Sequence, residues 1–125
     1  MGGELEQELR DYFGALDRME LEPLLERLTD DMQGIDEISQ GWTRGKSAFA
    51  AKVGVLTEKI SDVSTEITDV VEHVWGDTGV LTCWMEQDYT YEGAEQHVSA
   101  PTTVVFRRLD GAWKMAVFHM IPVSE

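Results

Sequence analysis

The sequence contains one cysteine, three histidines and no asparagine, and each scarcity excludes a class of site. Cys83 alone forms no disulfide within the chain and supplies neither a paired thiol motif nor a cysteine zinc site. His73, His97 and His119 lie in three different segments, so we expect no bound metal and no cofactor. A lone reduced thiol fits the cytoplasm, and the lack of asparagine removes any N-glycosylation sequence.

Basic residues and long apolar runs are also scarce. Lys and Arg number 10 against 24 Asp and Glu, and the net charge of −14 repels phosphate backbones and anionic membranes. No apolar run approaches the ~20 residues of a membrane helix, and no basic segment precedes one. We therefore expect no nucleic-acid partner, no membrane, and a soluble cytoplasmic protein whose 125 residues form a single domain, 1–125.

Helical periodicity marks the first half of the chain. Apolar residues spaced at three and four predict an amphipathic helix from Glu4 to Asp17. A short helix is expected from Glu22 to Leu28 and a third from Ser47 to Lys59. Between these two, the pattern breaks at residues 29–31, and Met32 to Asp36 is typical of a short strand that leads into a polar turn.

The second half is rich in β-branched and aromatic residues. Strands are predicted at 63–75 and 80–91, and residues 98–123 form two more, joined by the hairpin turn Asp110–Gly111. Strict alternation along the last strand places Trp113, Met115, Val117 and His119 on one face. Helices followed by an antiparallel meander predict an α+β domain with helices packed on one curved sheet.

Both faces of the last strand are largely apolar, although helices can cover only one of them. The residues at 114, 116, 118 and 120 on the second face include Ala116, Phe118 and Met120. Such a face needs a second layer. We therefore expect a homodimer formed across the sheet.

The order of elements, with GWTRGKSAF at 41–49 and DGAWKMAVFH at 110–119, resembles the nuclear transport factor 2-like superfamily and, within it, the SnoaL-like group. The resemblance covers nearly the whole chain. It implies a cystatin-like α+β roll, a cone-shaped half-barrel in which N-terminal helices close a curved mixed or antiparallel sheet over a pocket. The group includes ketosteroid isomerases, polyketide cyclases, dehydratases and non-catalytic association domains, so the fold alone specifies no reaction.

The same resemblance suggests catalytic roles for three residues. Tyr12 falls where ketosteroid isomerases carry a tyrosine that donates a hydrogen bond to the substrate oxygen, and Asp36 falls near their general-base carboxylate. His119 matches a histidine that SnoaL-like sequences often place at the end of the final strand. Near Thr103, where a second acidic donor is expected, the sequence has only hydroxyl and apolar groups.

Each candidate has a structural interpretation beside the functional one. A desolvated Asp36 is suited to proton abstraction next to a carbonyl, but the same residue is also suited to a solvated turn. Tyr12 and His119 fit either a hydrogen bond to a ligand or a place in the core. The further candidates for lining a pocket for a small apolar ligand, or else for packing the core or a subunit interface, are Trp42, Trp84, Tyr89 and Thr103.

Two functions follow from the sequence. The first is an enzyme, an isomerase, cyclase or dehydratase that acts by proton transfer on a small apolar carbonyl compound. The second is a non-catalytic ligand-binding or dimerisation module of the same fold. The missing second acid favours the module, whereas the titratable residues at family positions favour the enzyme.

Overall fold

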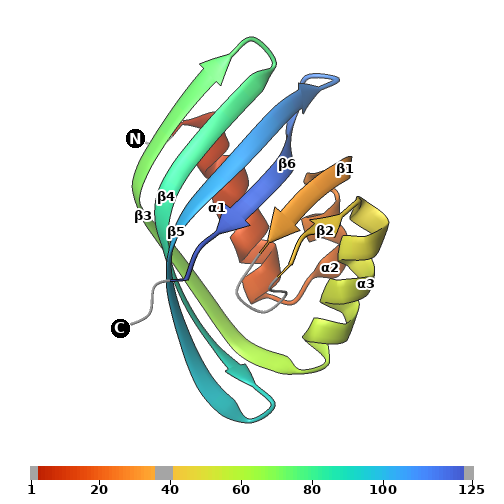
Figure 1. Ribbon diagram of the computed structural model, residues 1–125, viewed down its shortest axis with the longest axis vertical. Coiled ribbons are helices and arrows are strands. Elements are labelled where there is room, and N and C mark those ends of the chain that lie inside the picture. Colours follow the sequence, from red (N-terminus) through yellow and green to blue (C-terminus); the bar gives the residue numbers. More distant parts are fainter. Residues whose placement is uncertain (1–2, 36–40, 123–125) are drawn as a thin grey trace.

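The computed structural model describes residues 3–35 and 41–122. Within these residues three helices and six strands follow one another, and Figure 1 shows how they are arranged. They are α1 (Glu4–Asp17), α2 (Leu21–Leu25), β1 (Leu28–Ile35), β2 (Thr43–Arg44), α3 (Lys46–Thr57), β3 (Ile60–Trp75), β4 (Thr78–Tyr91), β5 (Ala94–Leu109) and β6 (Ala112–Met120). None of the described helices is long and apolar enough to cross a membrane.

The strands form one curved sheet in the order β2-β1-β6-β5-β4-β3. The four long strands β3 to β6 pair antiparallel, as the turns predicted, and β1 pairs parallel to β6, which makes the sheet mixed. The helices lie on one side of this sheet, with α1 against its concave inner face (Figure 1). The expected α+β half-barrel is therefore confirmed.

Two boundaries and one additional strand differ from the sequence prediction near the start of the sheet. The segment 29–31, expected to break the pattern, belongs to β1, and α2 ends at Leu25 rather than at Leu28. Strand β2 was not anticipated. Pairing with β6, including the bond from Met115 N–H to the Arg27 carbonyl at 2.8 Å, supplies partners that local propensity does not reveal.

The contact between α1 and the sheet forms the centre of the core. Leu5 and Leu9 are fully buried, and Tyr12 and Phe13 are 6% and 4% exposed. At Gly79 of β4, an added Cβ would lie only 2.6 Å from Leu5 Cδ1. Helix and sheet therefore meet closely at the first turn of α1, and glycine permits that approach.

A β-bulge in β6 changes which side chains face the helices. Val117 pairs with Val105 and Met115 with Phe106, so Ala116 has no partner of its own on β5. The expectation of strict alternation is wrong after this point, because one extra residue reverses the faces. Before the bulge Trp113 and Met115 point inward. After it Phe118 and Met120 point inward, and Val117 and His119 point outward.

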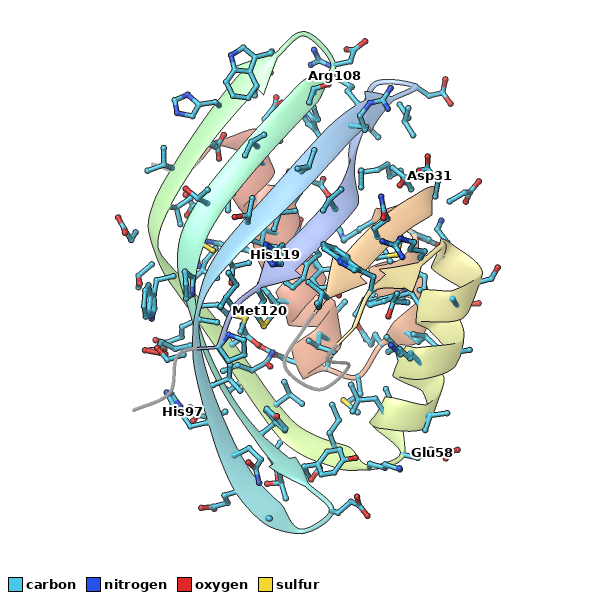
Figure 2. All side chains as sticks on the ribbon, viewed as in Figure 1. Asp31, Glu58, His97, Arg108, His119 and Met120 are labelled. Carbon is cyan, nitrogen blue, oxygen red and sulfur yellow. The ribbon has the colours of Figure 1, made fainter. Side chains whose placement is uncertain are left out.

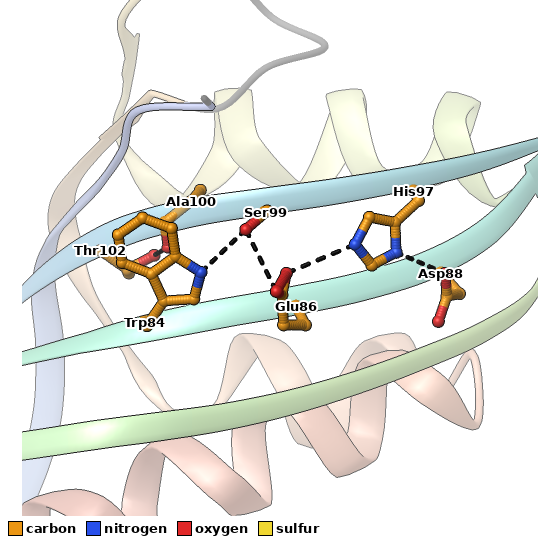
Figure 3. Close-up of polar contacts among 7 residues, drawn as sticks. All are labelled: Trp84, Glu86, Asp88, His97, Ser99, Ala100 and Thr102. Carbon is orange, nitrogen blue, oxygen red and sulfur yellow. Dashed lines mark hydrogen bonds and ion pairs between the residues drawn. The ribbon is translucent and has the colours of Figure 1, made fainter. Parts of the chain in front are cut away.

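A hydrogen-bonded cluster crosses the outer face of β4 and β5 (Figure 3). Trp84 Nε1 donates to Ser99 Oγ at 2.8 Å, and that hydroxyl donates to Glu86 Oε1 at 3.1 Å. His97 lies 2.6 Å from Asp88 through Nδ1 and 3.4 Å from Glu86 through Nε2. The hydrogen bond to Asp88, helped by Glu86, raises the pKa of the exposed His97 above 6.5.

Substituting two glycines by alanine should have opposite effects on stability. Gly54→Ala lies in α3, where the new methyl group meets nothing within 4 Å, and it should raise the free energy of unfolding by about 0.5–1 kcal/mol. Gly79→Ala forces Leu5 to move within the core and should lower the free energy of unfolding by about 1–3 kcal/mol. Urea denaturation of both variants measures the difference, and equal effects would contradict the close approach at Gly79.

Removal of His97 should change how stability depends on pH. Because the pKa of His97 is raised in the folded state, its contribution is complete below pH 6.5 and is lost as the pH rises through the folded pKa. The stability advantage of the wild-type protein over His97→Gln should therefore shrink between pH 6 and pH 9 in urea melts. His73→Gln, which leaves the cluster intact, is the matched control. An advantage that is constant with pH would show that the cluster does not bind the extra proton.

Candidate functional site

A cavity of about 80 Å³ lies between the helices and the inner face of the sheet. Helix α1 forms one wall, α3 another, and the inward residues of β1, β3, β4 and β6 form the floor. Most of its surface is apolar. The lining residues are Tyr12, Phe13, Leu16, Leu28, Met32, Gly34, Ile35, Thr43, Phe49, Val53, Leu56, Ile60, Val63, Gln87, Tyr89, Met115, Phe118 and Met120.

Four side chains bring polar groups to this apolar surface: Tyr12, Thr43, Gln87 and Tyr89. The Tyr12 ring packs edge-to-face on Phe13 at 5.4 Å, which holds it on the cavity side of α1. The Thr43 hydroxyl accepts a hydrogen bond from Lys52 Nζ at 2.8 Å. An apolar enclosure with a few fixed polar groups is the usual composition of a small-molecule site.

Gln87 is the polar residue that sequence reasoning missed. Its Nε2 donates to Thr65 Oγ at 3.0 Å, and Thr65 donates to Asp17 from both Oγ (2.8 Å) and the backbone N–H (3.1 Å). Burial raises the pKa of the Asp17 carboxyl despite these bonds. The signal was present in β4, where alternation places Gln87 among the inward residues Met85 and Tyr89.

The structure separates the predicted site residues into two groups. Tyr12 and Tyr89 line the cavity, and Asp36 lies outside the described residues. Trp84, Thr103 and His119 instead line an open hollow of about 290 Å³ on the outer face of the sheet. Trp42 also lies outside the cavity, with its ring stacked on His119 at 5.8 Å.

The position of His119 differs from the expected one because of the bulge at Ala116. In Figure 2, His119 and the next residue, Met120, project from the same strand, with Met120 lining the cavity and His119 the outer hollow. On that face Arg44 lies over the Trp42 ring, 5.7 Å from its centroid, and continues the stack. His119 and Tyr12 therefore do not converge on a common point, and the pairing of these two residues in one site is not supported.

The described residues contain no group of three or more His, Cys, Asp or Glu side chains arranged to hold a metal ion. Burial raises the pKa of the Cys83 thiol to about 11. This thiol stays protonated at neutral pH and is a poor nucleophile. The chemistry that the cavity supports is therefore hydrogen bonding and, through residues beside it, proton transfer.

The fold is shared with many solved structures of low sequence identity. A ketosteroid isomerase-like protein from Erwinia carotovora atroseptica is 20% identical, with a TM-score of 0.81 over 96% of this chain and 94% of that one. An NTF2-like protein from Pseudomonas putida is also 20% identical, with a TM-score of 0.83 over 98% of this chain and 86% of that one. A protein with a cystatin-like fold from Caulobacter vibrioides is 15% identical, with a TM-score of 0.82 over 96% of this chain and 87% of that one.

Comparison at the level of sequence gives a family but no close relative. No curated protein shows a significant match to the chain. The sequence model of the SnoaL-like domain, in contrast, matches residues 5–121, nearly the whole length. The cone-shaped fold and this match agree, and the chain belongs to the SnoaL-like domain family.

Proposed function

We propose that this protein binds a small, mostly apolar carbonyl compound in the inner cavity and acts on it by proton transfer, as an isomerase, cyclase or dehydratase. The observation that carries the proposal is the cavity itself, which is lined by apolar walls and supplied with a few polar groups. Its volume of about 80 Å³ is roughly half that of an apolar cavity able to hold benzene. The cavity is partly open to solvent. A short chain or a small ring can therefore occupy it with part of the molecule in the opening, whereas a polycyclic compound is too large.

The chemistry in this proposal depends on Tyr12 and Asp36. Tyr12 is buried at the cavity wall, where a phenolic hydroxyl is suited to donate a hydrogen bond to a carbonyl oxygen. The described lining residues include no carboxylate, histidine or lysine, so the base must come from elsewhere. Asp36 follows directly in sequence after Ile35, which lines the cavity. This adjacency supports Asp36 as the base.

A non-catalytic ligand-binding module is the second candidate. It is favoured by the scarcity of ionisable groups among the described lining residues. Thr103 lies on the outer face and does not reach the cavity. Proton exchange of a bound ketone distinguishes the two candidates.

Exchange of ketone α-protons in heavy water tests the proposed chemistry. Cyclopentanone bound by the wild-type protein should exchange its α-protons faster than in buffer, as followed by NMR. Asp36→Asn should lower this rate by about 10²–10⁴-fold, because a positioned general base contributes that much, and Glu37→Gln should leave it unchanged. Binding without exchange would establish the non-catalytic module, and an unchanged rate in Asp36→Asn would remove Asp36 from the mechanism.

We also propose that two copies of the chain pair across the outer face of the sheet. The helices that the structure describes cover only the inner face, and the outer face carries large apolar side chains in contact with water. Val71 is 49% exposed, Trp75 61% and Ile121 55%. Exposed apolar surface of this kind is typical of a subunit interface.

Light scattering after size exclusion tests the pairing. The wild-type protein should have twice the mass of one chain at micromolar concentration. Val71→Glu should give the single-chain mass, because it buries a charge in the interface. Val55→Glu, the same change at a residue of α3 that is 55% exposed, should keep the double mass. A wild-type monomer would contradict the proposed pairing.

A further inference from the structure

The amide of Gln87 is oriented from behind by a chain of hydrogen bonds. The Thr65 hydroxyl carries one proton, which it donates to Asp17 Oδ1 at 2.8 Å. Towards Gln87 this hydroxyl can therefore only accept, and Gln87 must present its NH₂ group, with Nε2 at 3.0 Å. The carbonyl oxygen Oε1 is consequently turned away from Thr65.

The Gln87 oxygen Oε1 has no hydrogen-bond partner within the described part of the chain. Gln87 is 8% exposed and lines the cavity, and no hydrogen bond within residues 3–35 and 41–122 reaches its Oε1. Oε1 is not among the fully buried side-chain atoms that lack a partner, and Gln87 lines the cavity. A ligand in the cavity can therefore reach this oxygen and donate a hydrogen bond to it.

The position of Asp17 is unfavourable for a residue that serves only to stabilise the fold. It is the last residue of α1, where the negative end of the helix dipole repels a carboxylate. Its pKa is raised by burial, and both of its oxygens are used on Thr65. The arrangement is better explained by the need to fix the orientation of Thr65 and, through it, of Gln87.

We propose that Gln87 is the specificity-determining residue of the cavity and that its Oε1 accepts a hydrogen bond from the hydroxyl of a small, neutral, otherwise apolar ligand. Thr65 and Asp17 are positioning residues, which act through Gln87. A compound with a phenolic, enolic or alcoholic hydroxyl is the class that fits. The inference rests on the proposed function only in requiring that the cavity bind small apolar molecules.

Phenol and toluene form the test pair, because they have nearly the same shape and only phenol donates a hydrogen bond. NMR titration of the full chain measures both affinities and shows whether the shifted signals belong to cavity residues. The wild-type protein should prefer phenol roughly five-fold, the value of a hydrogen bond of ordinary net strength. Gln87→Met keeps the volume and should abolish the preference without weakening toluene binding. Gln96→Met, the same change at an exposed residue of β5, should preserve it.

The positioning role has its own variants. Thr65→Val removes the hydroxyl and should reduce the preference for phenol, whereas Thr65→Ser retains the hydroxyl and should restore it; thermal melts confirm that each variant is folded. A preference for phenol that survives in Gln87→Met would overturn the role of Gln87 while leaving the binding cavity in place. Failure of the wild-type protein to bind either compound would instead overturn the proposed function, and this inference with it.

Discussion

Burial of the apolar side of α1 in the concave face of the sheet is the interaction on which the rest of the structure depends. Leu5 and Leu9 are fully buried there, and each such side chain contributes about 1.5–3 kcal/mol. At Gly79 the helix nearly touches the strand, whereas the wall around Tyr12 and Phe13, two turns later, borders the cavity. A straight helix cannot follow a curved sheet along its whole length. Tight packing at one end therefore leaves space at the other, and that space is the candidate site.

The two faces of the sheet differ in the side chains that they carry. The inner face carries the cavity, and the outer face carries exposed aromatic and aliphatic side chains together with the cluster around His97. The bulge at Ala116 assigns the last residues of β6 to these faces, sending Met120 inward and His119 outward. A single inserted residue thus decides whether an imidazole belongs to a ligand site or to a surface.

The cavity has few polar groups among its described lining residues, and hydrogen bonds from behind fix the orientation of two of them. Gln87 is fixed by Thr65 and Asp17, and Thr43 by Lys52. Because each amide or hydroxyl is committed on one side, only its remaining lone pairs or protons face the cavity. Orientation fixed before binding lowers the entropic cost of recognition. The arrangement suits selection among small molecules that differ by one hydroxyl group.

The sequence by itself determined the helix at Glu4–Asp17, the antiparallel meander, the α+β fold of the family and the placement of Tyr12 on the apolar face of the first helix. These features depend on periodicity and turn residues, which are local. Only the tertiary structure decided the parallel pairing of β1 with β6, the outward position of His119, Trp84 and Thr103, and the link from Asp17 to Gln87. Each of these depends on which strand lies beside which, and in what register. A bulge of one residue or a contact between positions 17 and 65 leaves no periodic trace in the chain.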